Sequence, residues 1–350
     1  MRTYLITGGA GFIGSNFVKY ILKKYGDNAY VINLDALTYA GNLENLRDIE
    51  TLKNYKFIKE NICDKDAVSN LFKEFKIDYV VNFAAETHVD KSIENPEIFL
   101  RSNVEGTLNL LENARRSWAK SKIYDEYRDN CKFIQISTDE VYGSLGKDGF
   151  FTESTNLSPN SPYSSSKASA DLLARAYFKT YKMPINITRC SNNYGPYQFP
   201  EKLIPLTIQR ALKCKKIPVY GDGLNIRDWL FVKDHCCAID IVLNKGKLGE
   251  IYNIGGNNEK TNIDVVKLII KIIKDKINME VSEDLIEFVT DRKGHDRRYA
   301  IDSSKLKKEL NWMPETSFEK GIKETINWYL NNKAWLKNIE TGRYRRLSAY

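Results

Sequence analysis

Residues 7–17 read TGGAGFIGSNF, and they stand between an apolar run at 3–6 and an amphipathic helical pattern at 12–25. Gly8, Gly11 and Gly14 have G-x-x-G-x-x-G spacing, and Gly9, Gly11 and Gly14 fit G-x-G-x-x-G. A turn of this kind brings the backbone close to a pyrophosphate and points the first helix amides at it. The alternative is a glycine turn with no nucleotide. The strand before the turn and the helix after it favour a dinucleotide site.

Asp35 ends the second apolar run, 21 residues beyond Gly14. A carboxylate at this point accepts hydrogen bonds from the ribose hydroxyls of a dinucleotide and repels a 2′-phosphate. The cofactor predicted by this pair of features is therefore NAD rather than NADP.

Short apolar runs alternate with helical patterns through the first half of the chain. The runs stand at 3–7, 29–35, 55–61, 78–85 and 131–137, and the helical patterns between them at 12–25, 65–75 and 103–118. Strand–helix–strand alternation predicts a parallel sheet with helices on both faces. Because such crossovers are right-handed, we expect an α/β, doubly wound parallel Rossmann sheet.

The pattern changes after a helix at 164–181 and a strand at 185–190. SNNYGPYQFPEKLIP (191–205) is typical of a loop, and RDWLFVKD (227–234) of a strand leading into a helix. We predict an NAD-binding Rossmann domain at 1–190, to which 226–254 returns. Residues 191–225 and 255–340 then form a smaller mixed α/β C-terminal substrate lobe, and 341–350 a surface tail.

Tyr163 and Lys167 stand four residues apart at the start of a helical pattern, in YSSSK. Residues at this spacing share a helix face, and a nearby ammonium lowers a phenol's pKa. Tyr163 could then act as a base, although an isolated Tyr-x-x-x-Lys usually means two surface residues. The dinucleotide turn upstream favours the catalytic interpretation.

Asp139 and Glu140 follow the buried run KFIQI directly, in STDEVY at 137–142. Ligands of doubly wound sheets bind beyond the carboxyl ends of the strands, which is where this pair is expected. Taken alone, the pair could be two solvated acids capping a turn. Beside a hydride carrier and a tyrosine base, an acid and a base suggest proton removal next to a ketone and loss of a hydroxyl, which is a dehydration. Asp139 would have to hold a proton, as closely spaced carboxylates allow.

Composition excludes several other classes of protein. The 350 residues are 42% apolar and 28% charged, and no apolar stretch is long enough to span a membrane. No basic-then-apolar leader opens the sequence, so we expect a cytoplasmic protein. The net charge of +8 is spread among acids, which favours a site for an anionic ligand over nucleic-acid binding. Six cysteines without paired spacing predict neither a disulfide framework nor a metal site.

With these motifs in hand, the chain resembles the extended short-chain dehydrogenase/reductase family, whose members act on nucleotide sugars. TGGAGFIG and YSSSK carry the likeness. FAAETHVDKSI (83–93), ISTDEVYG (136–143), CSNNYGPYQFPEKLIP (190–205), IRDWLFVKDH (226–235) and DRKGHDRRYAID (291–302) make it closest to the 4,6-dehydratases of that family. The resemblance covers essentially the whole chain in the same order. It implies NAD-dependent removal of water from a nucleoside-diphosphate glucose.

The resemblance also implies roles for individual residues. The catalytic residues are Thr138, Asp139, Glu140, Tyr163 and Lys167. The cofactor contacts are Gly8, Gly11, Phe12, Ile13, Gly14, Asp35, Ala36, Leu37, Thr38, Asn61, Ile62, Phe83, Ala84, Ala85, Ser102, Tyr163, Lys167 and Asn193. The substrate contacts are Glu86, Thr87, Thr138, Asn192, Lys202, Leu203, Pro218, Val219, Tyr220, Arg227, Asn262, Arg292 and His295. Asn61 departs from the family's usual aspartate beside the adenine.

Glu140 is thereby implied as the base at sugar C5 and Asp139 as the acid at C6. The substrate is expected to be dTDP-glucose, with UDP-glucose as the alternative because the two differ by little more than a methyl group. The family also implies a homodimer that pairs through helices around 103–118 and 164–181. The product would serve a deoxysugar pathway such as rhamnose synthesis. A nucleotide-sugar epimerase or decarboxylase needs no acid pair, and a non-catalytic NAD-binding regulator needs neither the pair nor Tyr163, so both are disfavoured.

Overall fold

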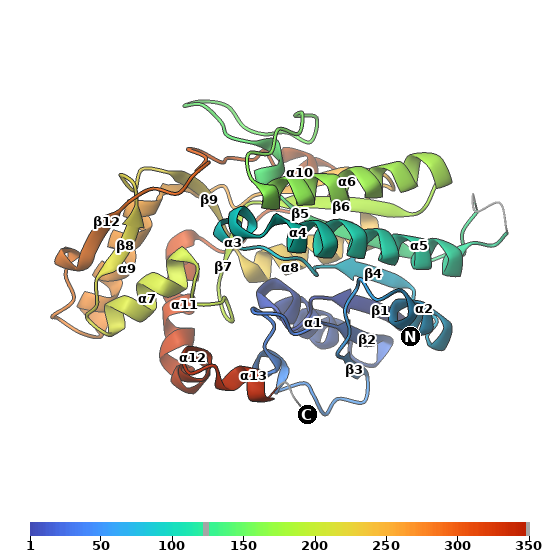
Figure 1. Cartoon of the computed structure of the whole chain (residues 1–350), viewed down its shortest axis with the longest axis horizontal. Coiled ribbons are helices and arrows are strands. Elements are labelled where there is room, and N and C mark those ends of the chain that lie inside the picture. The colour runs from blue at the N-terminus through green and yellow to red at the C-terminus, as the bar shows by residue number, and fades with distance from the viewer. Residues whose placement is uncertain (122–125, 348–350) are drawn as a thin grey trace.

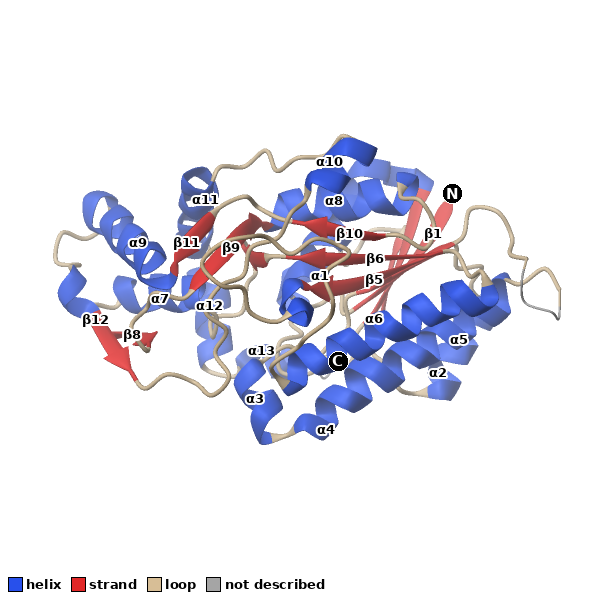
Figure 2. Ribbon diagram, turned by 90° about the horizontal axis from the view of Figure 1, so that it is seen from above, coloured by secondary structure: helices blue, strands red, loops and turns tan. Residues whose placement is uncertain are grey.

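The structure is a computed structural model that describes residues 1–121 and 126–347 (Figure 1). Its main part is a sheet with helices on both faces, and a smaller lobe adjoins one end of that sheet (Figure 2). The described helices include none that is long and apolar enough to cross a bilayer.

The main sheet has seven strands in the order β10-β6-β5-β4-β1-β2-β3, and every neighbouring pair is parallel. Its strands are β1 (Arg2–Thr7), β2 (Ala29–Leu34), β3 (Tyr55–Ile58), β4 (Tyr79–Asn82), β5 (Lys132–Thr138), β6 (Ile185–Cys190) and β10 (Ile251–Ile254). Apart from the edge strand β3, the strands are buried along almost their whole length, as expected where helices cover both faces. The chain reverses its direction of winding between β1 and β4, which is where doubly wound sheets bind ligands. The predicted fold class is confirmed.

Two helical layers enclose this sheet (Figure 2). One face carries α1 (Phe12–Tyr25), α8 (Val232–Lys245) and α10 (Ser304–Leu310). The other carries α2 (Lys65–Glu74), α5 (Gly106–Trp118) and α6 (Pro162–Tyr181). Two short helices, α3 (Val89–Glu94) and α4 (Pro96–Phe99), lead into α5. Each layer has its own apolar core, so the sheet is held from both sides.

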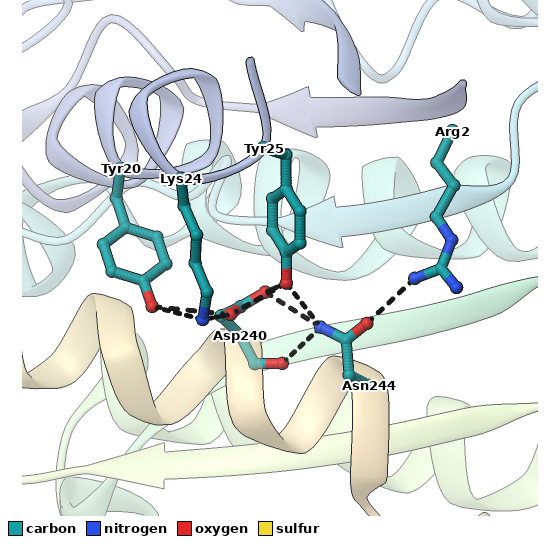
Figure 3. A network of polar contacts seen from close by, with 6 residues as sticks. All are labelled: Arg2, Tyr20, Lys24, Tyr25, Asp240 and Asn244. Atoms are coloured by element: carbon teal, nitrogen blue, oxygen red, sulfur yellow. Dashed lines mark hydrogen bonds and ion pairs between the residues drawn. The ribbon is translucent and has the colours of Figure 1, made fainter. Parts of the chain in front are cut away.

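Helices α1 and α8 are also joined by a polar network around Asp240, whose side chain is buried (Figure 3). Its carboxylate accepts hydrogen bonds from Lys24 Nζ at 2.5 Å, Tyr25 OH at 2.8 Å and Asn244 Nδ2 at 2.9 Å. Charged hydrogen bonds in a partly desolvated place are stronger than neutral ones. The network therefore fixes α1, the helix that begins at the glycine turn, against its neighbour.

The smaller lobe contains two further sheets. One has the order β11-β9-β7, formed by β7 (Asn192–Tyr194), β9 (Ile226–Phe231) and β11 (Glu259–Thr261). The other pairs β8 (Ile217–Tyr220) with β12 (Ile286–Val289). The helices here are α7 (Leu203–Leu212), α9 (Asn262–Lys276), α11 (Phe318–Asn331), α12 (Lys333–Glu340) and α13 (Arg343–Leu347). They share an apolar core of their own.

Three segments differ from the predicted domain limits. Strand β9, expected to return to the main domain, pairs within the lobe, and α10, expected in the lobe, packs beside β10 with Leu306 in the main core. The tail predicted at 341–350 is instead helical at α13, where Tyr344 is buried. Residues 348–350 lie outside the described part. For the first two segments, periodicity predicts the elements but not the surfaces on which they dock; in the third, the helix α13 itself was not predicted.

Candidate active site

A cavity opens beyond the carboxyl ends of the main strands and extends to the lobe. Residues that follow β1, β2, β4, β5 and β6 line it, beginning with Gly8, Asp35, Phe83, Asp139 and Ser191. Of the predicted cofactor contacts, those that line it are Gly8, Gly11, Phe12, Ile13, Gly14, Asp35, Ala36, Thr38, Asn61, Ile62, Phe83, Ala84, Ala85, Ser102, Tyr163, Lys167 and Asn193. All five predicted catalytic residues line it as well. Leu37 does not, because its side chain packs against the main core.

The glycine turn forms one end of this cavity. Gly8 has φ +67°, and a Cβ on Gly14 would lie 2.2 Å from the Gly8 carbonyl oxygen, so neither position accommodates a side chain. Gly11 is the N-cap of α1 and gives the helix no side-chain cap. The amides of the first helical turn are thus left for an anion, and the positive end of the helix dipole favours one. This arrangement fits the pyrophosphate of a dinucleotide.

Asp35 lies across from the turn at the end of β2. Its two carboxylate oxygens accept hydrogen bonds from Ala10 N at 2.9 Å and Leu37 N at 2.8 Å. Burial raises the pKa of Asp35, and the two amides oppose that shift. The carboxylate is thereby fixed in orientation while it faces the cavity, as an acceptor for ribose hydroxyls must be. At the adenine end, Asn61 Oδ1 already accepts from Cys63 N at 2.9 Å.

Tyr163 and Lys167 are presented by the first turns of α6. Ser161 and Ser164 form a capping box there, and Pro162 occupies the first helical position, so the start of the helix is well determined. The predicted lowering of the Tyr163 pKa is not found: burial and then the Glu140 carboxylate raise the pKa of Tyr163 well above its usual value. Lys167 donates from Nζ to the Ile136 carbonyl at 2.7 Å, and its own pKa is lowered by burial. Tyr163 is therefore a phenol in this state of the protein.

The acid pair occupies a 3-10 turn, Asp139–Tyr142, that continues directly from β5. Thr138 organises the turn, since its hydroxyl accepts from Glu140 N at 3.3 Å and donates to Asp139 Oδ1 at 3.2 Å. Asp139 is 1% exposed, and within the described residues its Oδ2 has no hydrogen-bond partner. A buried carboxylate oxygen without a donor favours the protonated form of the acid.

The charged groups that most affect the pKa differ between the two acids: they are mainly negative for Asp139 and mainly positive for Glu140. Burial raises the pKa of Asp139 well above its usual value, and the negative charges of Glu140 and Asp228 raise it further. Burial also raises the pKa of Glu140, but the cations Arg292, Arg227 and Lys202 oppose that shift. The pKa of Asp139 is therefore the more strongly raised of the two, and Asp139 is the acid of the pair that favours its protonated form.

The predicted substrate contacts divide into two groups. Glu86, Thr87, Thr138, Asn192 and Lys202 line the cavity. The remaining contacts do not line it, and they are Leu203, Pro218, Val219, Tyr220, Arg227, Asn262, Arg292 and His295. Most of this second group belongs to the lobe, where it extends from the mouth of the cavity.

Several members of the second group have local partners. Val219 is buried in the lobe core, and the rings of Tyr220 and His295 meet edge to face at 6.3 Å. Arg227 donates to the Ile226 carbonyl at 2.8 Å and the Asp296 carbonyl at 2.9 Å. Two of its five N–H donors are used in this way, so three remain for an anion, enough for a bidentate contact.

The motifs did not single out some residues that the cavity contains, among them Tyr39, Cys190, Gln198 and Glu201. Tyr39 OH donates to Glu201 Oε1 at 3.0 Å, which closes one side of the cavity. Tyr39 and Glu201 adjoin the predicted residues Thr38 and Lys202, and Cys190, Gln198 and Glu201 lie within the quoted stretch 190–205, so position beside or within a motif was the available signal. The pairing of Tyr39 with Glu201, which are 162 residues apart, had no local signal in the sequence.

A glycine turn, a Tyr-x-x-x-Lys helix and a doubly wound sheet around one cavity define an enzyme of the extended short-chain dehydrogenase/reductase class. Within that class, residues 5–325 match the family model described as GDP-mannose 4,6 dehydratase. The chain belongs to this family.

Similar proteins agree with that placement. A dTDP-glucose 4,6-dehydratase of Xanthomonas campestris is 53% identical over 348 residues, which cover 99% of this chain and 98% of the relative. The crystal structure of dTDP-glucose 4,6-dehydratase from Bacillus anthracis in complex with NAD matches with TM-score 0.86 and 53% identity, covering 97% of this chain and 100% of that one. A dTDP-glucose 4,6-dehydratase double mutant from Streptomyces venezuelae, crystallised with NAD, matches with TM-score 0.88 and 42% identity, again covering 97% and 100%.

Proposed function

We propose that this protein is a dTDP-glucose 4,6-dehydratase, which converts dTDP-glucose into dTDP-4-keto-6-deoxyglucose and water with NAD as a retained cofactor. One observation carries the proposal: Asp139 and Glu140 share a turn beside Tyr163, and burial and the neighbouring negative charges raise the pKa of Asp139 well above its usual value, as a general acid requires. An oxidoreductase or an epimerase has no use for that pair. The names of the similar proteins support the same activity.

The residues present fit NAD. The glycine turn and the uncapped start of α1 would hold the pyrophosphate, and Asp35 would hold the adenosine ribose. Lys167 and Tyr163 would face the nicotinamide ribose. When bound, NAD⁺ takes a hydride from sugar C4 and returns it to C6, so the cofactor is recovered in each turnover.

Tyr163 removes the proton of the sugar 4-hydroxyl as C4 becomes a ketone. Because the Tyr163 pKa is raised in the protein alone, this step depends on positive charge next to the phenol. Lys167 is the residue of the chain placed to supply it, four positions along the same helix. Thr138 lies at the end of β5, where its hydroxyl would bind sugar O4 and orient it toward Tyr163.

Glu140 then takes the C5 proton, which the neighbouring ketone makes acidic. Asp139 delivers its proton to the 6-hydroxyl, which leaves as water. Loss of water leaves an intermediate with a 4-ketone and a C5–C6 double bond, which would be reduced by hydride at C6. A proton at C5, delivered back by Glu140, completes the 4-keto-6-deoxy product.

Substrate recognition is proposed to begin at the cavity and to continue over the lobe. Lys202 and Asn192 would contact the sugar end of the substrate. Arg227 and Arg292 would contact the diphosphate, and both lie close enough to the cavity to lower the pKa of Glu140. Pro218 to Tyr220 would face the pyrimidine. These cations fit an anionic substrate of this kind.

The test is an assay of the purified protein with dTDP-glucose and with UDP-glucose. Formation of the 4-keto-6-deoxy product is followed by the absorbance that such sugars develop in alkali. We expect turnover with dTDP-glucose, and a kcat/KM for UDP-glucose lower by about 10- to 100-fold, the range that a methylene-sized difference provides. Interconversion to a 4-epimer without dehydration, or no turnover of either sugar, would contradict the proposal.

We further propose a cytoplasmic homodimer whose product feeds deoxysugar synthesis such as that of rhamnose. Helices α5 and α6 lie side by side (Figure 2). Support for the dimer comes from exposed leucines on these helices, Leu108 at 40% and Leu172 at 54% exposure, with Leu100 at 52% in the turn that precedes α5. Light scattering on Leu172→Glu, with the exposed Leu248→Glu as control, tests it. A dimeric Leu172→Glu protein would contradict pairing through this face.

A further inference from the structure

One wall of the cavity is the segment 35–46, named here the β2 loop. Ala36, Thr38, Tyr39, Ala40 and Gly41 of this loop all line the cavity on its dinucleotide side. The loop is not a relaxed conformation on its own. Leu37 has φ +52°, a left-handed conformation that is strained for a residue with a side chain and persists only when the surroundings impose it.

The C-terminal segment 333–345, named here the C-terminal strap, supplies part of those surroundings. Trp335 Nε1 donates to Asn45 Oδ1 at 2.8 Å, and Tyr344 OH donates to the Tyr39 carbonyl at 2.7 Å. Asn338 Nδ2 donates to Glu44 Oε1 at 2.6 Å. Figure 1 shows α12 and α13 beside the segment that follows β2.

These contacts continue to the glycine turn. Asn45, which accepts from Trp335, donates from its own Nδ2 to the Ala10 carbonyl at 2.9 Å. Asn42 N donates to the same carbonyl at 3.0 Å. The strap is thus two hydrogen bonds removed from the backbone that would hold the pyrophosphate.

The strap also contacts the opposite wall, the segment 195–202. The Phe199 ring lies between the rings of Tyr39 at 5.9 Å and Tyr344 at 6.0 Å. Tyr39 OH donates to Glu201 Oε1 of this segment at 3.0 Å. The two walls and the strap therefore form one continuous packed unit around the mouth of the cavity.

We propose that the C-terminal strap fixes the β2 loop over the bound dinucleotide and so slows release of the cofactor between turnovers. Trp335 and Tyr344 are its positioning residues, since neither lines the cavity. The inference rests on the proposed function only in taking NAD as the ligand. An enzyme that recovers its cofactor in every cycle gains from slow release, and a closed loop provides it.

The experiment compares NAD dissociation from the wild-type protein with dissociation from Tyr344→Phe and Trp335→Phe. Each variant removes one polar hydrogen-bonding group and keeps an aromatic ring. Tyr252→Phe is the matched control, because it removes a tyrosine hydroxyl that bonds Glu309 and the Lys247 amide away from the cavity. Release of radiolabelled NAD is timed after addition of excess unlabelled NAD, without sugar substrate.

We expect each strap variant to release NAD about fivefold faster, equivalent to ~1 kcal/mol, and the control to match the wild type. With NAD in saturating supply, kcat for dehydration should change by less than about twofold, because Tyr163, Asp139 and Glu140 are untouched. The melting temperature of the NAD-free protein serves as the measure of a purely structural effect, and it should fall no further than in the control.

Unchanged NAD release in both variants, or an equal change in Tyr252→Phe, would overturn the proposal. A fall in kcat at saturating NAD would likewise contradict a retention role. Because release is measured without sugar, the result does not depend on the dehydratase activity. If the wild-type protein binds NAD but does not dehydrate dTDP-glucose, the proposed function is refuted, whereas the proposed role of the C-terminal strap in NAD release is not.

Discussion

Asp139→Asn is the substitution that most directly tests how the acid pair works. The amide keeps the shape of the side chain, and its oxygen can still accept from Thr138, as Asp139 Oδ1 does at 3.2 Å. What it removes is the transferable proton. Since a positioned general acid contributes about 10²- to 10⁴-fold, we expect kcat for dehydration to fall by about 10²- to 10³-fold, or ~3–4 kcal/mol of barrier.

The pH dependence of the dehydration rate provides a second test of the same residue. Burial, with the charges of Glu140 and Asp228, raises the pKa of Asp139. The acid thus stays protonated to a higher pH than an ordinary carboxyl and loses activity as pH rises through that raised pKa, which gives an alkaline limb. In Asp139→Asn this limb should disappear from the residual activity, because the amide has no proton to lose.

The assay follows two signals in a single turnover, the absorbance of reduced nicotinamide and the alkaline absorbance of the keto-deoxy product. In the proposed mechanism, oxidation at C4 uses Tyr163 and Lys167, so the first signal should persist in Asp139→Asn while the second is lost. Asp148→Asn, an exposed acid on the following loop, is the control and should behave as wild type. Product formation in Asp139→Asn within about threefold of wild type would refute the assignment of Asp139 as the acid.

Three further substitutions test other parts of the molecule. Tyr163→Phe should lose both signals of that assay, with kcat down by about 10²- to 10⁴-fold, since oxidation itself then lacks its base; retention of the nicotinamide signal would argue against this role. Gly14→Ala places a Cβ 2.2 Å from the Gly8 carbonyl oxygen, so NAD binding by titration calorimetry should be abolished, and an unchanged affinity would contradict the predicted turn. Asp240→Asn removes the charge that receives Lys24 in the network of Figure 3 and should cost about 2 kcal/mol, lowering the melting temperature by about 2–4 °C. An unchanged melting temperature would show that the α1–α8 contact does not depend on that charge.

The layout of the sheet followed from local patterns in the sequence. Apolar runs and helical periodicity are set by neighbours a few residues away, so six of the seven strands of the main sheet were predictable, all but β10, as were the positions of Gly14, Asp35 and the acid pair at strand ends. Burial of these residues in one cavity follows from strand order, which right-handed crossovers constrain. The individual roles of the site residues stay predictions.

Other features depend on contacts that no local pattern contains. The pairing of Tyr39 with Glu201 joins residues 162 positions apart, and Trp335 reaches Asn45 across 290. The expected effect of Lys167 on Tyr163 was wrong for a related reason. Both residues lie on α6 at i, i+4 as predicted, but burial and the Glu140 charge raise the pKa of Tyr163, and both depend on how the whole chain packs.

The turn Asp139–Tyr142 has a consequence for how this fold diversifies. Everything that would turn a sugar oxidation into a loss of water is carried by two adjacent side chains on one short turn, fixed by the hydroxyl that precedes them. The sheet, the cofactor turn and the tyrosine helix need not change for the chemistry to change. A lineage could therefore gain or abandon dehydration through substitutions at two codons, and a protein engineer could attempt the same exchange without redesigning the scaffold.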